Sequence, residues 1–533
     1  MHEYDIKPIA EKLGLKEEQL IAYGREKAKI ELKTIPENLP RKGKLILCTA
    51  ITPTKAGEGK TTTAISLADG LALLKKNALA CLREPSLGPV FGVKGGGAGG
   101  GESTLYPEDD INLHFNGDLH AITTVNNLIA ALIENELYQN TIDVDPDRIV
   151  FPHAMDMNDR SLRDITVSQN DKKGIPHHSS FVITAACEIM AIFCLAKNLE
   201  DFLDRIEDIT VAYRKDGTPI FARELQVRNA CKKLIENALN PNLVQTKYHT
   251  PALVHGGPFA NIAHGTNTVI ATDLGLKLSD YVVTEAGFGS DLGMEKYLDI
   301  VSPLAGFHPD LIVMVCSIRA LKLHGGVKFE DLSIPNVEAM VDGFKNLEKH
   351  VRNVSLYHVP CLVSINHFSQ DDPSETLALE KLLNERGIPF AYNSSYQDGP
   401  KGALALAEKA LDILESTPSE FAPIVTEKDS IPEKIEKISE KIYGADSVEY
   451  DDGILQEIEG YQKQGYQNFS VCMSKVPNSL SDDAHLLNVP KHTIHVKKLR
   501  LFTGARFIVP LTGDVFTMPG LPKVPAAVKM EDE

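Results

Sequence analysis

A glycine-rich loop between an apolar segment and an amphipathic one constrains the fold of this chain more than any other feature. Residues 44–50 (KLILCTA) are predicted to form a buried strand, and residues 64–74 carry apolar side chains at helical spacing. Residues 52–63 (TPTKAGEGKTTT) lie between them. In a strand, glycine loop and helix arranged in this order, backbone N–H groups and the helix dipole converge on anionic oxygens. The segment is therefore predicted to cradle phosphate, and nucleotide chemistry is the first hypothesis.

Individual positions of this phosphate loop have expected roles. Its glycines permit a tight backbone path, Lys60 reaches the terminal phosphates, and the hydroxyl of Thr61 holds Mg2+. The predicted nucleotide-binding residues of the loop are Thr54, Lys55, Ala56, Gly57, Glu58, Gly59, Lys60 and Thr61. Thr54 stands where the usual pattern has glycine, and Lys55 resembles the early lysine of dimerising partition-type ATPases. The alternative, a glycine turn without a ligand, is disfavoured by the well-placed Gly-Lys-Thr.

Composition narrows the classes of protein that this chain fits. Its 533 residues allow about two to four domains. The formal net charge of −18 leaves no broad basic surface, so no nucleic-acid partner is expected. The amino terminus lacks the features of a signal peptide and the apolar runs are short, so a cytoplasmic protein without membrane contact is expected. Eight scattered cysteines, without a Cys-x-x-Cys pair, are predicted to be buried thiols rather than zinc ligands or disulfides.

Strand-like and helix-like segments alternate along much of the chain, which favours an α/β fold with parallel strands and helices on both faces. Further strands are predicted at residues 78–82, 109–118, 253–254, 281–284, 310–317, 361–365 and 389–392. Helices are predicted at residues 374–385, 402–414 and 431–443, with additional helical stretches between 126 and 240. The helix at 431–443 is expected to bury Ile435, Ile438 and Ile442 and to carry a Glu433–Lys437 pair.

Ligands of such sheets sit beyond the carboxyl ends of the strands, so the residues that follow each strand are candidates for a site. Arg83 follows the strand at 78–82 and is expected beside the phosphate loop. Residues 92–101 (GVKGGGAGGG) are too glycine-rich for a helix or strand. Either they are a linker or, as the embedded Lys94 favours, they wrap anionic oxygens with backbone N–H groups. The predicted residues of this anion loop are Lys94, Gly95, Gly96 and Gly97.

Other candidates carry weaker signals. The glycine loops at 255–265 and 285–293 each leave a strand, where a turn and a ligand loop are both plausible. The pair at 177–178 (HH) has no further ligand at a recognisable spacing, so no metal site is predicted there. Phe368 and Tyr396 lie just beyond two strand ends and either grip a flat ligand or pack beneath their loops.

Seven segments, in order, resemble those of one family, the formate–tetrahydrofolate ligases. They are the phosphate loop and residues 82–89 (LREPSLGP), 92–101, 256–265 (GGPFANIAHG), 283–289 (VTEAGFG), 315–326 (VCSIRALKLHGG) and 517–522 (TMPGLP). The resemblance covers nearly the whole chain, and several motifs matching in order are more specific than any single glycine loop.

This resemblance implies ATP-dependent condensation of formate with tetrahydrofolate through formyl phosphate, giving 10-formyltetrahydrofolate, ADP and phosphate. Lys60 and Arg83 are implied as catalytic residues, Thr61 as the Mg2+ ligand of MgATP, and the anion loop as part of the formyl phosphate site. Phe368 matches the pterin-stacking phenylalanine, and Tyr396 is its partner ring. Further nucleotide-binding residues are implied at Glu285, Ala286, Gly287 and Phe288.

The resemblance also implies an assembly and a domain plan. It implies a homotetramer activated by a monovalent cation, K+ or NH4+, acting on tetrahydrofolate or its polyglutamates. The expected fold is a P-loop-type parallel sheet domain at residues 1–290 plus two smaller α/β domains. One of these combines residues 291–350 with 515–533, and the other is a Rossmann-like domain at 351–514 that contributes the folate clamp.

Three departures from the family pattern leave alternatives open. Tyr396 stands where the clamp usually has Trp, Gly97 and Glu102 replace an Ala and a Tyr, and Lys55 adds charge to the phosphate loop. A carboxylate at Glu102 would weaken anion binding if it pointed into the loop. One alternative is a nucleotide switch of the partition-ATPase type, which accounts only for residues 44–84. Another is a family member that binds folate without catalysis.

Overall fold

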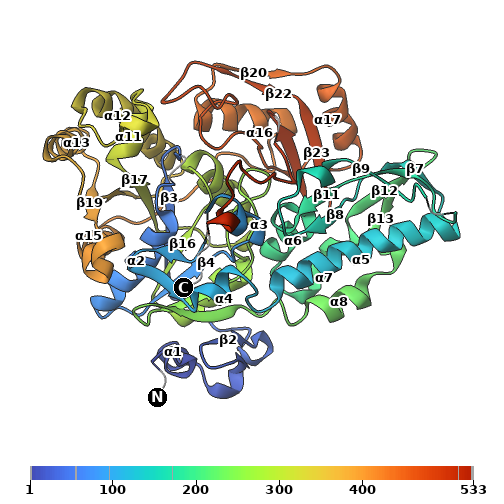
Figure 1. Ribbon diagram of the computed structural model, residues 1–533, viewed down its shortest axis with the longest axis horizontal. Helices are drawn as coiled ribbons and strands as arrows, with labels where there is room; N and C mark the ends of the chain where they lie inside the picture. The colour runs from blue at the N-terminus through green and yellow to red at the C-terminus, as the bar shows by residue number, and fades with distance from the viewer. Residues whose placement is uncertain (1–2, 55–56, 95, 171, 514, 530–533) are drawn as a thin grey trace.

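The computed structural model describes residues 3–54, 57–94, 96–170, 172–513 and 515–529, and shows an α/β protein built around one large mixed sheet (Figure 1). Seven neighbouring strands of this sheet are parallel. In sheet order they are β15 (Pro251–Val254), β4 (Ala78–Leu82), β16 (Tyr281–Glu285), β3 (Lys44–Ala50), β17 (Leu311–Cys316), β18 (Cys361–Asn366) and β19 (Phe390–Asn393). Each was predicted from its apolar run, and their carboxyl ends meet at one edge.

Antiparallel strands extend the sheet beyond β15. They are β14 (Asn242–Thr246), β2 (Lys27–Ile30) and β1 (Leu20–Tyr23), with β6 (Ser103–Tyr106) and β5 (Gly99–Gly100) attached beside β14. The sheet is therefore mixed, while the part that carries the predicted site is parallel.

Helices cover both faces of the parallel strands because the side chains of each strand point alternately to two cores, one on each face. In β3, Ile46 and Cys48 join one core and Leu45 and Leu47 join the other. The first core is closed by α2 (Lys60–Leu73) and α15 (Leu404–Ser416). The second is closed by α9 (Val269–Leu278), α11 (Ile318–His324), α12 (Val337–Ser355) and α13 (Pro373–Glu385). The predicted helices at 374–385 and 402–414 are thus confirmed.

Two regions flank the sheet in Figure 1. The region between β6 and β14 holds α4 (Glu108–Asn112), α5 (Asp118–Gln139), α6 (Glu188–Leu195), α7 (Leu199–Glu207), α8 (Arg228–Ile235), β7 (Val144–Ile149), β8 (His153–Met155), β9 (Ile165–Val167), β10 (His177–Ser179), β11 (Phe181–Ile183), β12 (Thr210–Arg214) and β13 (Pro219–Phe221). The C-terminal region holds α16 (Ile431–Lys437), α17 (Ile454–Lys463), β20 (Ser447–Tyr450), β21 (Ser470–Val471), β22 (Thr493–Val496), β23 (Lys498–Phe502) and β24 (Phe507–Leu511). The main sheet continues from β16 through β3 and β17 to β18, and the division into three domains stays a prediction.

Two local predictions are wrong. Residues 108–112 form α4 instead of a strand, because Glu108, Asp109 and Asp110 lie in the first turn of a helix that follows Pro107. The glycine-rich segment at 92–101, called the glycine loop below, was expected to form neither helix nor strand. In the structure Val90–Lys94 is π-helical, and Gly99–Gly100 pairs with β6 as β5.

The helix predicted at 431–443 is present but differs in its surface contacts. It continues from α16 as a π-helix through Ile438–Tyr443, and Ile435, Ile438 and Ile442 are fully buried as predicted. The predicted pair of Glu433 and Lys437 makes no direct contact among the described residues: the pKa of Glu433 is lowered mainly by hydrogen bonds from Ser430 and less by the charge of Lys437. The Glu433 carboxylate accepts the Ser430 backbone N–H, and the Lys437 ammonium pairs with Asp429 at 2.5 Å. An N-terminal capping box therefore takes up the glutamate.

The cysteines behave as the sequence indicated. All eight are free thiols, seven of them buried, and burial raises the pKa of each. Among the residues that the structure describes, no helix is both long enough and apolar enough to cross a membrane.

Candidate active site

The phosphate loop joins β3 to α2 at the carboxyl edge of the sheet, as predicted. Gly57 and Gly59 adopt left-handed conformations with φ of +77° and +76°, and Gly59 caps α2, which begins at Lys60. The first amides of this helix are the type of group that binds phosphate oxygens. Lys55 and Ala56 lie outside the described residues.

Glu58 braces the loop from within. Its side chain is 2% exposed and accepts hydrogen bonds from the Thr54 N–H at 2.8 Å and the Ser317 hydroxyl at 3.2 Å. Asn366 Nδ2 donates to the Glu58 carbonyl at 3.2 Å. Ser317 directly follows β17 and Asn366 ends β18, so the loop is tied to the ends of two neighbouring strands. The predicted nucleotide-binding Glu58 thus has an internal structural contact for each carboxylate oxygen.

Two buried histidines hold the base of the loop. His350 Nε2 accepts the Thr52 N–H at 2.9 Å, and its Nδ1 lies 2.6 Å from the Ser290 hydroxyl. His324 Nε2 donates to the Thr52 carbonyl at 3.0 Å. Burial lowers the pKa of His350 to about 3 and that of His324 below its usual range. Both rings are therefore neutral, and neutral rings supply the acceptor and donor that Thr52 needs.

Glu285 joins the phosphate loop to Arg83. Its carboxylate, 5% exposed, accepts the Thr61 hydroxyl at 2.8 Å through Oε2 and pairs with Arg83 Nη2 at 3.2 Å through Oε1. Thr61 is in the first turn of α2, Glu285 ends β16 and Arg83 follows β4. These three predicted residues meet because β4, β16 and β3 are adjacent in the sheet. The pairing itself was not predicted from the sequence.

The turn after β16 packs tightly behind this group. The Ala286 N–H donates to the Cys48 carbonyl at 3.0 Å, and the Gly287 N–H donates to the Gly265 carbonyl at 2.9 Å. A Cβ at Gly287 would lie 2.9 Å from Arg83 Nη1, so glycine permits the arginine to occupy its position. Phe288 adopts a φ of +59°, a conformation that non-glycine residues rarely take. The 255–265 loop thus supports the predicted nucleotide-binding turn.

The glycine loop lies against the segment that carries Arg83. The Gly97 N–H donates to Asn112 Oδ1 at 2.8 Å, and a Cβ at Gly97 would lie 2.7 Å from Cγ of Pro85. A Cβ at Gly96 would lie 3.1 Å from Asn112 Nδ2. The loop is thus anchored rather than a free linker. Gly95 and the side chain of Lys94 lie outside the described residues.

The two candidate folate-binding rings follow β18 and β19, which pair directly. The Phe368 ring lies 4.7 Å from the Arg319 guanidinium, and Tyr396 is 49% exposed in the short helix α14 (Ser395–Asp398). Gln397 Nε2 donates to the Ser369 hydroxyl at 3.2 Å, which links the two loops. The rings are thus placed on neighbouring loops at the same edge as the phosphate loop.

Sequence reasoning missed several supporting residues. Asn112, His350 and Asn366 hold the site together, yet none belongs to a motif that identifies this role. Only Asn366 gave a usable signal, because it lies two residues before the candidate ring Phe368.

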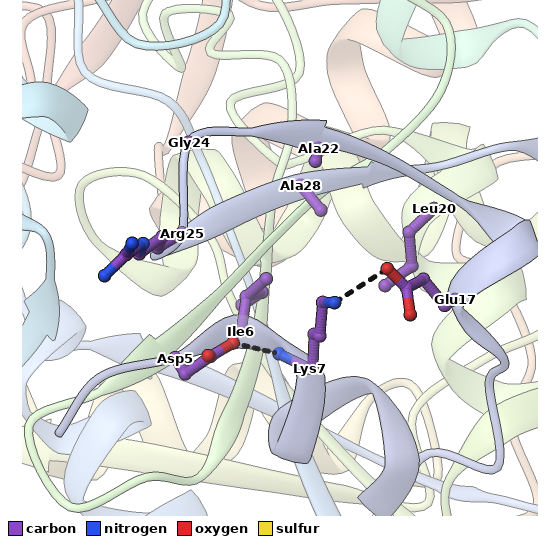
Figure 2. Close-up of a pocket in the computed structure, with 9 residues that line it drawn as sticks. All are labelled: Asp5, Ile6, Lys7, Glu17, Leu20, Ala22, Gly24, Arg25 and Ala28. Atoms are coloured by element: carbon purple, nitrogen blue, oxygen red, sulfur yellow. Dashed lines mark hydrogen bonds and ion pairs between the residues drawn. The ribbon is translucent and has the colours of Figure 1, made fainter. Parts of the chain in front are cut away.

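One cavity lies away from all of these residues. It has a volume of about 450 Å3 and opens between α1 (Ile6–Lys12) and the β1–β2 hairpin (Figure 2). Its lining residues are Asp5, Ile6, Lys7, Glu17, Leu20, Ala22, Gly24, Arg25 and Ala28. The Lys7–Glu17 ion pair at 2.7 Å crosses one side of it. Among the described residues, no group of three or more His, Cys, Asp or Glu side chains is arranged to hold a metal ion.

The family model of formate–tetrahydrofolate ligases matches residues 1–533. The chain belongs to this family. It is therefore a ligase of one-carbon folate metabolism, and formate, ATP and tetrahydrofolate are the substrates that the family implies. The match extends far beyond residues 44–84 and gives no support to the partition-ATPase alternative. For a formate–tetrahydrofolate ligase, the adjacency of a phosphate loop and an arginine has a direct chemical use.

Proposed function

We propose that this protein ligates formate to tetrahydrofolate in two steps, with ATP consumed to form formyl phosphate and 10-formyltetrahydrofolate, ADP and phosphate as products. The observation that carries the proposal is the contact of Glu285 with both Thr61 and Arg83. Through this contact Thr61, which is suited to MgATP, and Arg83, which is suited to formate, both meet the Glu285 carboxylate. A γ-phosphate held by the loop is then beside a carboxylate substrate held by the arginine.

In the first step, a formate oxygen attacks the γ-phosphorus and the bond to ADP breaks. Lys60 and the amides at the start of α2 stabilise the phosphoryl oxygens, which carry the charge of the transition state. The Thr61 hydroxyl and Glu285 carboxylate are oxygen ligands of the kind that Mg2+ prefers, and they are assigned to the ion that accompanies ATP. The anion loop, with Gly96 and Gly97, is assigned to the formyl phosphate.

In the second step, N10 of tetrahydrofolate attacks the formyl carbon, phosphate leaves and N10 loses its proton. Negative charge builds on the carbonyl oxygen, and the planar guanidinium of Arg83 is suited to stabilise it. Arg83 Nε is buried and has no hydrogen-bond partner among the described residues. A buried donor in this state is well suited to a ligand oxygen. Arg83 is accordingly assigned to formate and then to the oxyanion.

The folate is assigned to Phe368 and Tyr396, whose rings follow adjacent strands. Tyrosine retains a stacking face where the family usually has the larger Trp, so weaker folate binding is expected. A homotetramer, activation by K+ or NH4+, use of folate polyglutamates and a cytoplasmic location remain parts of the proposal that follow from the family.

The proposal is tested by incubating the purified protein with formate, MgATP and tetrahydrofolate and measuring 10-formyltetrahydrofolate. ATP turnover is expected to require both formate and tetrahydrofolate. A folded sample that binds ATP but forms no product, or that hydrolyses ATP equally well without the other substrates, would contradict it.

A further inference from the structure

Glu102, a residue that departs from the family pattern, turns away from the anion loop. It lies in the tight turn between β5 and β6, and its Oε2 accepts hydrogen bonds from Lys247 Nζ at 2.9 Å and the Tyr248 hydroxyl at 2.8 Å. Both partners belong to the turn between β14 and β15. These contacts hold the pKa of Glu102 below its usual range. The carboxylate is therefore ionised at neutral pH and committed to the neighbouring turn.

The backbone of the same residue holds the candidate folate ring. The Glu102 N–H donates to the Tyr396 carbonyl at 2.9 Å, and the Ser103 hydroxyl donates to the Ser395 carbonyl at 3.1 Å. A Cβ at Gly100 would lie 3.3 Å from Cε2 of Tyr396, so the ring rests on the glycine backbone. The Tyr396 segment thus has both its main chain and its ring fixed by residues 100–103.

Tyr248 contacts the same segment from its other end. A Cβ at Gly399, the C-cap residue of α14, would lie 2.6 Å from the Tyr248 hydroxyl. Tyr248 therefore stands between the Glu102 carboxylate and the end of the helix that carries Tyr396. The group formed by Glu102, Lys247, Tyr248 and Tyr396 is called the clasp below.

The exposure of the clasp indicates what it contributes. The Glu102 and Lys247 side chains are 40% and 42% exposed, and an ion pair at that exposure adds little to global stability. Its contribution is local, because it fixes the turn that the Tyr396 backbone and ring contact. A local effect of this kind changes the position of one ring without weakening the core.

We propose that Glu102 is a positioning residue for the folate substrate: by fixing the clasp it holds Tyr396 in the orientation that stacks on the pterin. This inference rests on the proposed function, and on the assignment of Tyr396 to the folate in particular. It makes Glu102 a determinant of folate affinity rather than a repulsive charge in the anion loop.

The test is a double-mutant cycle on the whole protein, read as KM and as Kd for tetrahydrofolate measured by equilibrium dialysis. Glu102→Ala is expected to raise both by about tenfold while kcat at saturating folate and KM for ATP change little, because the charge-assisted contacts with Lys247 and Tyr248 are both lost. Glu102→Gln keeps an acceptor for Tyr248 and is expected to restore most of the affinity. In a Tyr396→Ala background, Glu102→Ala is expected to have no further effect.

Glu408→Ala, an exposed carboxylate on α15, is the matched control and is expected to leave both constants unchanged. Three results would each overturn the inference. They are unchanged folate binding in Glu102→Ala, an effect of Glu102→Ala that adds fully to that of Tyr396→Ala, and an equal rise in the KM for ATP. Absence of product from the wild-type protein would count against the proposed function instead, and the dialysis arm would still decide the role of Glu102.

Discussion

Replacing Arg83 by alanine is expected to separate formate chemistry from nucleotide binding. The guanidinium lies 3.2 Å from the Glu285 carboxylate and its side chain is 21% exposed. Removing one donor that stabilises an oxyanion lowers kcat by about 100- to 1000-fold, or about 2.7–4 kcal/mol. Removal also deletes the contact of Arg83 with Glu285, which is 5% exposed, and this costs about 1–3 kcal/mol of folding free energy. The first loss is expected in kcat and the second in the melting temperature.

The assay measures 10-formyltetrahydrofolate formation together with the Kd of a non-hydrolysable ATP analogue. Arg83→Ala is expected to lose turnover while keeping most of its ATP affinity, because Lys60 and the α2 amides remain. Arg83→Lys keeps the charge but not the planar fork, so an intermediate loss of kcat is expected. Arg148→Ala is the control, because Arg148 stacks on Tyr213 in the region between β6 and β14 and has no contact with a site residue in the part of the chain that the structure describes.

Two results would refute the assignment of Arg83. If Arg83→Ala kept more than about a tenth of the wild-type kcat, the arginine would not stabilise the reacting oxygens. If ATP affinity fell in parallel with kcat, its role would be in nucleotide binding. A lower melting temperature alone, with kcat intact, would leave only its structural pairing with Glu285.

Three further predictions concern the support of the site. Lys475 and Asp291 form a fully buried ion pair at 2.7 Å, so Lys475→Met is expected to lower the free energy of unfolding, measured in urea, by about 3–5 kcal/mol. Adding Asp291→Asn should recover most of this loss, because the uncompensated buried charge is then removed. A loss below about 1 kcal/mol in the single mutant would contradict this. The pKa of His350 is about 3 in the fold against about 6.5 in the unfolded chain, so its contribution is complete above pH 6.5 and is lost as the pH falls toward 3. As the pH falls, the unfolding free energy of His350→Gln should therefore decrease less steeply than that of the wild type. The difference in slope is expected to be about 1.4 kcal/mol per pH unit between about pH 5.5 and 4. Parallel pH profiles of the two proteins would exclude this role. Gly97→Ala would place a Cβ 2.7 Å from Pro85, so the free energy of unfolding is expected to fall by about 1–3 kcal/mol and the KM for formate to rise. Wild-type values of both quantities would show that the loop accommodates the methyl group.

The sequence predicted the elements of the parallel sheet because each strand is a short, mostly apolar run next to a turn signal. It also placed Arg83 and Glu285 after strands, which is sufficient to bring them to one edge of the sheet. It did not predict which strands are neighbours. The order β4-β16-β3 joins segments some 200 residues apart, and only that order explains why one carboxylate contacts both Thr61 and Arg83.

Residues that act through long-range contacts could not be predicted from the sequence either, because their partners are neighbours only in the folded chain. His350 lies in the middle of α12, 298 positions from its partner Thr52, and nothing in its helical pattern distinguishes it from a core residue. The error at residues 108–112 has a different origin. A short apolar alternation there competes with the acidic residues of a helix N-terminus, and the helix forms.

The glycine loop finally acquires a physical reason for its composition. At one end Gly97 packs on Pro85, next to the Arg83 segment, and at the other end Gly100 and Gly101 pack on Tyr396. Any side chain at these positions would separate the loop from one of its two neighbours. The loop therefore spans from the proposed formate side to the proposed folate side, across the start of α2, where the Thr62 hydroxyl lies 3.7 Å from the Gly100 Cβ position. In the proposed mechanism an amine held near Tyr396 reaches a formyl group activated at Arg83, and one loop in contact with both residues would fix their spacing. The glycine run is thus better explained by close packing at both ends than by flexibility.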